Sequence, residues 1–437
     1  MRALKKLYKM VKLKKSKLLK NKLGKSRLLI FILIFASFGA LLYVLSRAAT
    51  QNVSLTASGP TSTQLPAKII NDSSAVGGKA FYFEGTGIPN GERLGISPGS
   101  PDVYLADGLT NATYMAKIAE LGMKWVRLDA NLYKSTNFID NAISEAKKNN
   151  LKVLATFTYG DTSNPQALAD KVTAYVTHWN SLGLLGSVGA YEIWNEPNNT
   201  GDPNIPFEDP VALAGFMKKA YPILKFSSPS LPVVAGGYAP GGGNAPCCNG
   251  NLANPADYLD ALYKANGNKS DGIFDAAAIH PYSSSEYPIA GVNNKSGWRN
   301  TQYLRNVMNF YGDADKQIWG TEAGWHSCAS YGSSSTPFTE AQRSTRFKND
   351  MKDWFYGLHN LDGSPKGEFN ASGGDWNTGP FIIYKLYKAG DSGSNMLGLI
   401  YTPSLRCDGL PSWYEPPIIN DIKFFSAANQ AVVNPTW

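Results

Sequence analysis

The sequence predicts an α/β protein with a single (β/α)8 barrel, and two observations lead to this prediction. Beyond residue 78, short apolar stretches alternate with longer helical patterns in successive units spaced by roughly 25–45 residues. The first of these strands is not followed by the Gly-x-Gly-x-x-Gly turn of a dinucleotide-binding, doubly wound sheet. A chain of 437 residues has room for such a barrel, because one barrel uses about 250 residues or more.

Eight strands are predicted, each short, apolar and bounded by residues that favour turns. The eighth has two candidate positions, because two apolar stretches occur near the end of the chain. In chain order the predicted strands span residues 93–97, 124–130, 152–159, 190–196, 232–238, 275–282, 317–322 and either 381–387 or 397–401. Helical stretches lie among them at residues 111–121, 137–149, 165–182, 210–226, 255–265 and 339–358.

An apolar segment near the N-terminus, residues 28–46, follows a strongly basic tail. Residues 1–27 contain twelve Lys or Arg and no acidic residue. The apolar segment is long enough to cross a bilayer as a transmembrane signal-anchor helix, and no polar face interrupts it as in a soluble core helix. Because positive charge stays on the cytoplasmic side of a membrane, we expect a cytoplasmic tail at 1–27 and an extracellular remainder.

The sequence allows two fates for this apolar segment. Ser46-Arg47-Ala48 resembles a signal-peptide cleavage site, after which the protein would be secreted. The basic region is longer than that of a usual signal peptide, which favours a retained, single-pass anchor in the cell membrane. Residues 47–78 are rich in Ser, Thr, Ala and Asn, and we expect them to form a flexible linker to a domain at 79–437.

The charge of the chain changes once the tail is set apart. The formal net charge is +8, but the residues after position 27 hold 30 Lys or Arg and 34 Asp or Glu. This mildly acidic body gives no reason to expect a nucleic-acid partner. Aromatic residues make up 12% of the chain, which suits either a surface that stacks on sugars or simply a large core.

Two of the predicted strands end in a glutamate. Residues 191–197 read Tyr-Glu-Ile-Trp-Asn-Glu-Pro, and residues 317–325 read Gln-Ile-Trp-Gly-Thr-Glu-Ala-Gly-Trp. Barrel enzymes take their catalytic groups from the carboxyl ends of strands, so Glu196 and Glu322 are expected to face each other at one opening. Two carboxyl groups, one protonated and one ionised, are what hydrolysis of a glycosidic bond requires. For each, a solvated glutamate at the barrel rim is the alternative.

Further polar residues end other predicted strands. They are Arg127 with Asp129, Tyr159, Asn195, Tyr238, and His280 with Tyr282. Because the carboxyl ends of the strands of a barrel meet at one opening, these residues are expected to converge there.

Four of these stretches resemble motifs of clan A glycoside hydrolases, the cellulase, mannanase and β-xylosidase families that share a (β/α)8 barrel. Residues 194–197, Trp-Asn-Glu-Pro, are similar to the acid/base motif of strand four, and residues 320–325 to the nucleophile motif of strand seven. Residues 125–127, Trp-Val-Arg, and 279–282, Ile-His-Pro-Tyr, resemble motifs of strands two and six. The resemblance covers residues 80–437 in strand order.

This resemblance implies a role for each matching residue. Glu196 would be the general acid/base and Glu322 the nucleophile. Asn195 would hold the 2-hydroxyl of the sugar, and His280 or Tyr282 would hydrogen-bond the nucleophile.

Two of the matching side chains have structural alternatives. The resemblance implies that Arg127 lies beneath Glu322 and keeps it ionised, as a nearby cation does. Arg127 could instead be a structural ion-pair partner of Glu192 or Asp129. Taken alone, His280 could be a hydrogen-bonded core histidine.

Aromatic residues near the opening are candidates for sugar stacking. Trp325 follows the second glutamate and could stack on a sugar or pack in the core. Many clan members carry a Trp on strand eight as the floor of the sugar subsite. Here residues 381–387 read Phe-Ile-Ile-Tyr-Lys-Leu-Tyr, so Tyr384 is the candidate substitute. This departure leaves the family within the clan, and hence the sugar, open.

Four cysteines follow predicted strands, at Cys247, Cys248, Cys328 and Cys407. An even number in an exported protein favours disulfides, with three possible pairings. A bridge between the adjacent Cys247 and Cys248 would be strained, so we expect one or two bridges from that pair to Cys328 and Cys407. Zinc is the alternative, but no Cys-x-x-Cys or paired His supports it. We expect no metal and no other cofactor.

These observations predict a retaining glycoside hydrolase that cleaves β-linked O-glycosidic bonds in extracellular polysaccharide or oligosaccharide. A non-catalytic carbohydrate-binding barrel is one alternative, although it would have no need of the paired glutamates. A transglycosylase is another, since it would use the same residues and differ in excluding water from the acceptor site.

Overall fold

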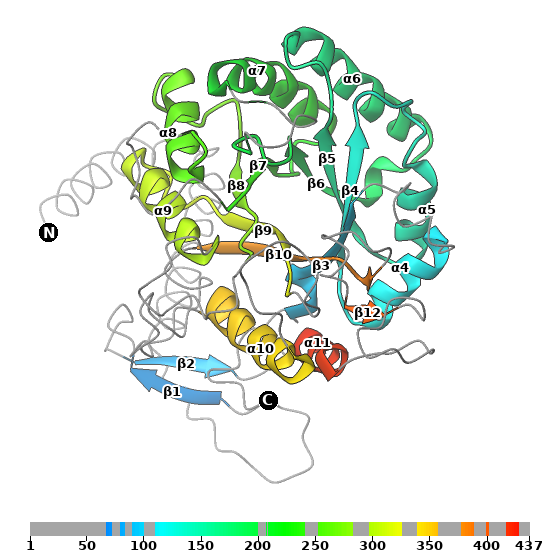
Figure 1. Ribbon diagram of the computed structural model, residues 1–437, viewed down its shortest axis with the longest axis vertical. Helices are drawn as coiled ribbons and strands as arrows, with labels where there is room; N and C mark the ends of the chain where they lie inside the picture. Colours follow the sequence, from blue (N-terminus) through cyan, green and yellow to red (C-terminus); the bar gives the residue numbers. More distant parts are fainter. Residues whose placement is uncertain are drawn as a thin grey trace, which may run out of the picture. The chain divides into compact units, whose positions relative to one another are not determined.

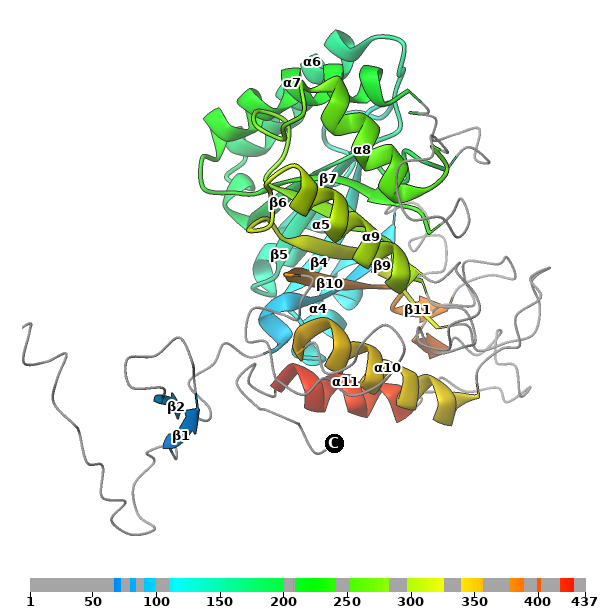
Figure 2. The same ribbon diagram turned by 90° about the vertical axis from the view of Figure 1, so that its left-hand side faces the viewer.

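Eight parallel strands close into a barrel, and helices surround it in the computed structural model of the protein (Figures 1 and 2). The structure describes residues 67–71, 79–83, 90–99, 110–199, 207, 209–240, 252–282, 297–325, 339–356, 377–388, 399–401 and 417–427. All statements below concern these residues.

The strands follow one another around the barrel in chain order, and the last pairs with the first. They are β3 (Leu94–Gly99), β4 (Trp125–Asn131), β5 (Lys152–Thr158), β6 (Val188–Ile193), β7 (Val233–Tyr238), β8 (Ala276–Ile279), β9 (Ile318–Ala323) and β10 (Thr378–Tyr384). Each predicted strand overlaps one of these, so the predicted barrel is confirmed. For the eighth strand, the position at 381–387 is the correct one. Ile400–Tyr401 instead forms β12, which pairs with β11 (Tyr387–Lys388) in a separate two-stranded sheet.

The helices alternate with the strands along the chain. They are α4 (Asn111–Glu120), α5 (Asp140–Lys148), α6 (Pro165–Ser181), α7 (Pro210–Ser227), α8 (Pro255–Ala265), α9 (Gly297–Phe310), α10 (Glu340–Tyr356) and α11 (Pro417–Ala427), with 3-10 turns η1 (Asn90–Arg93) and η2 (Leu185–Ser187). In α6, α7 and α8 an Asn or Asp caps the first turn and a Pro follows it, a pairing that starts helices. Helices α9 and α11 were not predicted; α11 lies beside α10 (Figures 1 and 2).

Apolar side chains fill the barrel below its opening. Their cluster consists of Trp125, Leu154, Ala190, Val234, Ala276, Ala278, Trp319 and Ile382. The rings of Trp125 and Trp319 meet edge to face at 5.4 Å between centroids. Because most of these residues lie toward the amino ends of their strands, inward positions nearer the carboxyl ends are left for polar side chains.

The described residues test only part of the predictions made for the N-terminal region. Ala67–Asn71 forms β1, which pairs antiparallel with β2 (Lys79–Phe83), so the stretch at 47–78 expected to be a linker contains a strand. Residues 28–46 and all four cysteines lie outside the described residues, and the anchor and disulfide expectations stay predictions. Among the helices that the structure describes, none combines the length and the apolar character needed to span a bilayer.

Candidate active site

The candidate site lies at the carboxyl ends of the barrel strands. Its side chains are Arg127 and Asp129 from β4, Asn195 and Glu196 just after β6, His280 and Tyr282 just after β8, and Glu322 from β9. These residues are spread over almost 200 positions of the sequence, and the parallel barrel brings them to one opening.

Asn195 and Glu196 lie in the turn that follows β6, which places their side chains at the opening. Trp194 and Glu196 both have left-handed backbones, with φ of 74° and 46°, which non-glycine residues adopt at a cost of roughly 1–3 kcal/mol each. The Trp194 ring is buried and packs edge-on against Phe207. The side chain of Asn198 holds the turn to the end of β7 through two hydrogen bonds with the backbone of Ala239. Packing and hydrogen bonds thus hold a strained turn at the opening.

Glu322 reaches the same opening because of an irregularity in β9. Phe381 of β10 pairs with Gly320, but Ile383 pairs with Ala323, so β9 advances three residues where β10 advances two. An extra residue of this kind changes which side chains face inward. Trp319 points into the barrel three positions earlier, and the irregularity allows Glu322 to do so as well.

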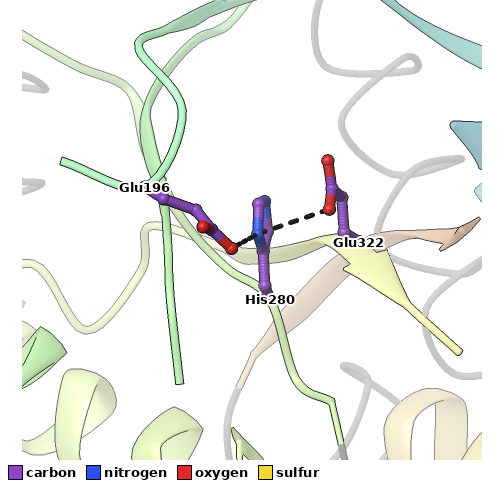
Figure 3. A group of neighbouring side chains, drawn as sticks. All are labelled: Glu196, His280 and Glu322. Carbon is purple, nitrogen blue, oxygen red and sulfur yellow. Dashed lines mark hydrogen bonds and ion pairs between the residues drawn. The ribbon is translucent and has the colours of Figure 1, made fainter. Parts of the chain in front are cut away.

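His280 lies between the two glutamates (Figure 3). Its Nδ1 is 2.8 Å from Glu196 Oε1 and 3.6 Å from Glu322 Oε2. Tyr282 donates its hydroxyl to Glu322 Oε2 at 2.9 Å, and Asn199 donates its amide to Glu196 Oε2 at 2.9 Å. One oxygen of Glu196 and one of Glu322 lie within 4.8 Å of each other. The two carboxyl groups therefore face one small space, with Tyr282 rather than His280 making the direct hydrogen bond to Glu322.

Arg127 joins three partners beneath this pair. Its Nε donates to Glu192 Oε2 at 2.5 Å, its Nη1 to Glu322 Oε1 at 2.7 Å and its Nη2 to Asn195 Oδ1 at 2.7 Å. The side chain is only 1% exposed. The sequence offered a contact to Glu322 and an ion pair with Glu192 as alternatives, and the structure contains both. A planar guanidinium can make all three bonds at once, which a lysine cannot.

The charges at the opening follow from burial and from these contacts. Burial lowers the pKa of His280, but the Glu322 and Glu196 carboxylates outweigh it and raise that pKa above its ordinary value. Burial raises the pKa of Glu196, but the hydrogen bond and charge of His280 and the Asn199 amide hold it below its usual range. Burial and the charge of Glu322 raise the pKa of Tyr282, which stays a donor. Both shifts favour a protonated His280 beside an ionised Glu196.

Asp129 is a third carboxyl group at the opening, and sequence analysis gave it no role beyond a possible partner of Arg127. It is 7% exposed, its Oδ1 has no hydrogen-bond partner, and Arg127 Nη1 lies 3.7 Å away. Burial raises the pKa of Asp129 to about 6; Arg127 and His280 oppose the rise, and Glu322 and Glu192 add to it.

The raised pKa makes Asp129 a cost to folding at neutral pH. The folded protein keeps this proton between about pH 4 and 6, where the unfolded chain has lost it, so stability falls as pH rises through that window. Above it the cost is at most about 3 kcal/mol. We expect Asp129→Asn to raise the free energy of unfolding at pH 7.5 by about 1–3 kcal/mol, and the gain to vanish below about pH 4. Denaturant unfolding at both pH values measures this, with Asp170→Asn at an exposed position of α6 as the control. Equal stability of Asp129→Asn and the wild type at pH 7.5 would contradict the prediction.

The two aromatic candidates differ in their placement. Trp325 is 1% exposed, donates its Nε1 to Asp350 Oδ2 of α10 at 2.8 Å and packs edge-on against Phe347. The stacking expectation for Trp325 is therefore corrected, because its polar edge and its ring are both used in the core between barrel and helix. Tyr384 is partly exposed at the end of β10, and the Lys385 ammonium lies 4.9 Å from the centre of its ring.

Gly237 of β7 allows His280 to lie where it does. A Cβ on Gly237 would be 2.2 Å from His280 Nε2 and 2.8 Å from Thr321 Oγ1, far inside van der Waals contact. The backbone of Gly237 also accepts a hydrogen bond from the Glu196 amide at 3.0 Å and donates one to Glu192 Oε1 at 3.2 Å. Any larger residue here must push the histidine away from the glutamates.

We therefore expect Gly237→Ala to lower activity by about 100-fold, because a displacement of about 1 Å at a catalytic group has that effect. The crowded methyl group should also destabilise the fold by about 1–3 kcal/mol. Gly215→Ala in α7 is the matched control, since its Cβ would meet nothing nearer than Pro165 Cγ at 4.0 Å. That change should stabilise the helix by about 0.5–1 kcal/mol. Kinetics and thermal unfolding of both variants check this, and an undiminished Gly237→Ala enzyme would contradict it.

Glu196, His280 and Glu322 could each offer one atom to a metal ion, since three such atoms lie within 4.8 Å of one another. The fit is poor for two reasons. Arg127 places a full positive charge on the second oxygen of Glu322, and the hydrogen bond between His280 and Glu196 carries a proton where a metal ligand must have none. The same groups fit acid/base and nucleophilic chemistry without a metal.

Two residues that hold the glutamates in place were not recognised as such from the sequence, which indicated Glu192 only as a possible partner of Arg127 and did not single out Asn199. Glu192 is buried and accepts hydrogen bonds from Arg127, Thr156 and the Gly237 amide. Its inward position follows from its spacing two after Ala190, which faces the barrel interior. Asn199 bonds Glu196 across a three-residue turn, and nothing in the sequence distinguishes it from its neighbour Asn198.

Comparison with known proteins identifies solved structures that share the barrel fold on which this site is built. In sequence, the chain matches no protein-family model and no curated protein. In structure, it is similar to the GH39 enzyme from Xanthomonas axonopodis pv. citri, with a TM-score of 0.53 and 12% identity over 79% of this chain and 68% of that one. It is also similar to a monomeric beta-xylosidase from Caulobacter crescentus CB15, with a TM-score of 0.53 and 13% identity over 79% of this chain and 70% of that one. A glucosidase from Croceicoccus marinus has a TM-score of 0.51 and 12% identity over 78% of this chain and 69% of that one. The predicted resemblance is thus confirmed for the barrel fold.

Proposed function

We propose that this protein is a retaining glycoside hydrolase that cleaves β-linked sugars with Glu322 as nucleophile and Glu196 as general acid/base. One observation carries the proposal. Two glutamates from different strands of a barrel face each other, with one oxygen of each within 4.8 Å. One of them is bound by Arg127 and Tyr282, and the other is hydrogen-bonded to His280.

The different surroundings of the two glutamates match the two roles. Glu322 accepts hydrogen bonds from the Arg127 guanidinium and the Tyr282 hydroxyl, which hold its carboxyl group in place for attack as a nucleophile. Glu196 instead is hydrogen-bonded to His280, which can supply the proton that a general acid must deliver. The pair holds one proton that moves to Glu196 as the leaving oxygen takes it up.

The reaction would proceed in two displacements. A Glu322 oxygen forms a bond to the anomeric carbon while the bond from that carbon to the leaving oxygen breaks, and Glu196 gives its proton to that oxygen. Glu196 then removes a proton from water, the water oxygen attacks the anomeric carbon, and Glu322 leaves as a carboxylate. Asn195 has its Oδ1 on Arg127, which turns its amide nitrogen toward the sugar 2-hydroxyl.

The short distance between the glutamates supports retention of configuration. Retaining enzymes hold their carboxyl groups about 5–5.5 Å apart, whereas inverting enzymes need about 6.5–9.5 Å to admit a water molecule. One oxygen of Glu196 and one of Glu322 lie within 4.8 Å of each other, which agrees better with the shorter spacing of retaining enzymes.

The choice of β-linked substrates rests on the neighbours in structure. Two of the similar structures are named as a beta-xylosidase and a glucosidase, and the third as a GH39 enzyme.

We further propose that residues 28–46 anchor the domain in a membrane with residues 1–27 inside the cell, which would place the site among extracellular glycans. Protease added to intact cells should then remove the barrel but spare the basic tail.

A transglycosylase and a sugar-binding barrel are the alternatives. A transglycosylase would use the same residues, and lengthened oligosaccharides among the products would identify it. The facing pair of Glu196 and Glu322 argues against a mere binding role, because sugar binding alone has no need of two glutamates held this close.

The proposal is tested by incubating the purified full-length protein with β-linked polysaccharides and nitrophenyl β-glycosides and measuring released reducing ends and nitrophenol. We expect release from at least one substrate. A folded protein that binds a glycan but releases nothing from any of them would instead support the binding barrel.

A further inference from the structure

Asp129 lies at the same opening as the two glutamates, and no described residue donates a hydrogen bond to its buried Oδ1. Along β4, Trp125, Arg127 and Asp129 alternate on the inward face, with Trp125 in the apolar floor and Arg127 in the layer that bonds both Glu192 and Glu322. Asp129 is therefore the inward residue nearest the opening on this strand, except for the partly exposed Asn131 at its end.

Among the described residues, the only charge contact of the Asp129 carboxyl group is a long ion pair with Arg127, without a hydrogen bond. The three donor positions of Arg127 that face the site are occupied by Glu192, Glu322 and Asn195 at 2.5–2.7 Å. Asp129 Oδ1 stands 3.7 Å from Nη1, beyond hydrogen-bond distance. No hydrogen bond from another described residue reaches this side chain, and its Oδ1 is buried without a partner. A buried carboxyl group left in this state destabilises a fold, so a structural reason for it is lacking.

The position of Asp129 relative to the nucleophile indicates what could bind it. Arg127 Nη1 contacts Glu322 Oε1 at 2.7 Å and faces Asp129 Oδ1 at 3.7 Å, so both carboxyl groups border the same nitrogen. A sugar whose anomeric carbon meets Glu322 brings its ring hydroxyls over this region. A carboxylate accepts short, strong hydrogen bonds from such hydroxyls.

We propose that Asp129 determines glycone specificity by accepting a hydrogen bond from a hydroxyl of the sugar ring other than the 2-hydroxyl, and that it thereby selects neutral sugars over uronic acids. This inference rests on the proposed glycosidase function. The hydroxyls at C3 and C4 are the candidates, because Asn195 is the partner proposed for the one at C2. A uronic acid would bring a second carboxylate next to Asp129, Glu322 and Glu192, where like charges repel strongly.

The test compares kcat/KM for a nitrophenyl glycoside that the wild type cleaves with kcat/KM for its 2-, 3- and 4-deoxy analogues. In the wild type, loss of the hydroxyl that Asp129 binds should lower kcat/KM by about 100-fold or more, since a buried polar group is then left without its partner. In Asp129→Ala the parent should lose a similar factor, and removing the same hydroxyl should then change kcat/KM by less than about threefold. Asp129→Asn, which retains the shape, should lie between and should raise the ratio of uronide to neutral-sugar hydrolysis.

Asp170→Asn on exposed α6 is the control and should show the full discrimination of the wild type. A general structural role would reduce all analogues by one factor, whereas the proposed contact removes the sensitivity to one hydroxyl. An active wild type whose discrimination among the analogues persists in both Asp129 variants would overturn the inference alone. A wild type that cleaves no glycoside would overturn the proposed function, and the inference with it.

Discussion

Glu322→Gln is expected to lower kcat for glycoside hydrolysis by roughly 10⁴-fold or more, because an amide cannot form the covalent glycosyl intermediate. The change is nearly isosteric. The Gln amide oxygen can still accept from Arg127, and its NH2 group can donate to the Tyr282 hydroxyl, so the fold should remain. Nitrophenol release and circular dichroism measure the two effects. Glu145→Gln, on the surface of α5, should keep wild-type activity. A Glu322→Gln enzyme with more than a few per cent of wild-type kcat would contradict the assignment.

Glu196→Gln should show a different dependence on the leaving group, which separates the two roles. Without a general acid, poor leaving groups such as alkyl alcohols should lose about 10²–10⁴-fold in rate, as general acid catalysis contributes that much. A dinitrophenolate needs little protonation and should lose far less in the first step. Equal losses for both leaving groups would show that Glu196 does not donate the proton.

Arg127→Met should destabilise the protein by about 3–5 kcal/mol, because it leaves Glu192 buried and unpaired beside Glu322. Denaturant unfolding gives the free energy. Combining Arg127→Met with Glu192→Gln should recover part of that loss, since the second change removes the buried charge. Arg127→Lys keeps one charge but cannot make the three bonds, so it should fold and lose at least about 100-fold in activity. Unchanged stability of Arg127→Met would contradict the account of the network.

The strands and most helices could be predicted because local signals agreed with the final packing. Helices α6, α7 and α8 each begin at an Asn or Asp followed by Pro, and the strands between them are apolar and short. Helix α9 lacks such signals, since its buried residues Leu304, Val307 and Met308 are set among many polar ones. Helix α11 packs against α10, which follows from tertiary structure rather than from local sequence.

The members of the site could be named from the sequence, but their contacts could not. Glu322 faces inward through an extra residue in β9, and Glu196 through a left-handed turn, neither of which strand periodicity predicts. The alternatives for Arg127 were both correct, because one guanidinium reaches Glu192 and Glu322 together. For Trp325 the sequence allowed sugar stacking or core packing, and the structure shows core packing, since a residue just past a strand can turn toward a helix as easily as toward the opening.

Labelling of the nucleophile tests the central claim most directly. A 2-fluoro analogue of the best glycoside substrate, with a good leaving group, should slow release of the glycosyl intermediate and leave a sugar attached to the protein. Mass spectrometry of the digested full-length protein should then find the added mass on the peptide containing Glu322 and nowhere else. A label on another carboxyl group, or release of product with inverted configuration and no label, would contradict the proposed roles of Glu196 and Glu322.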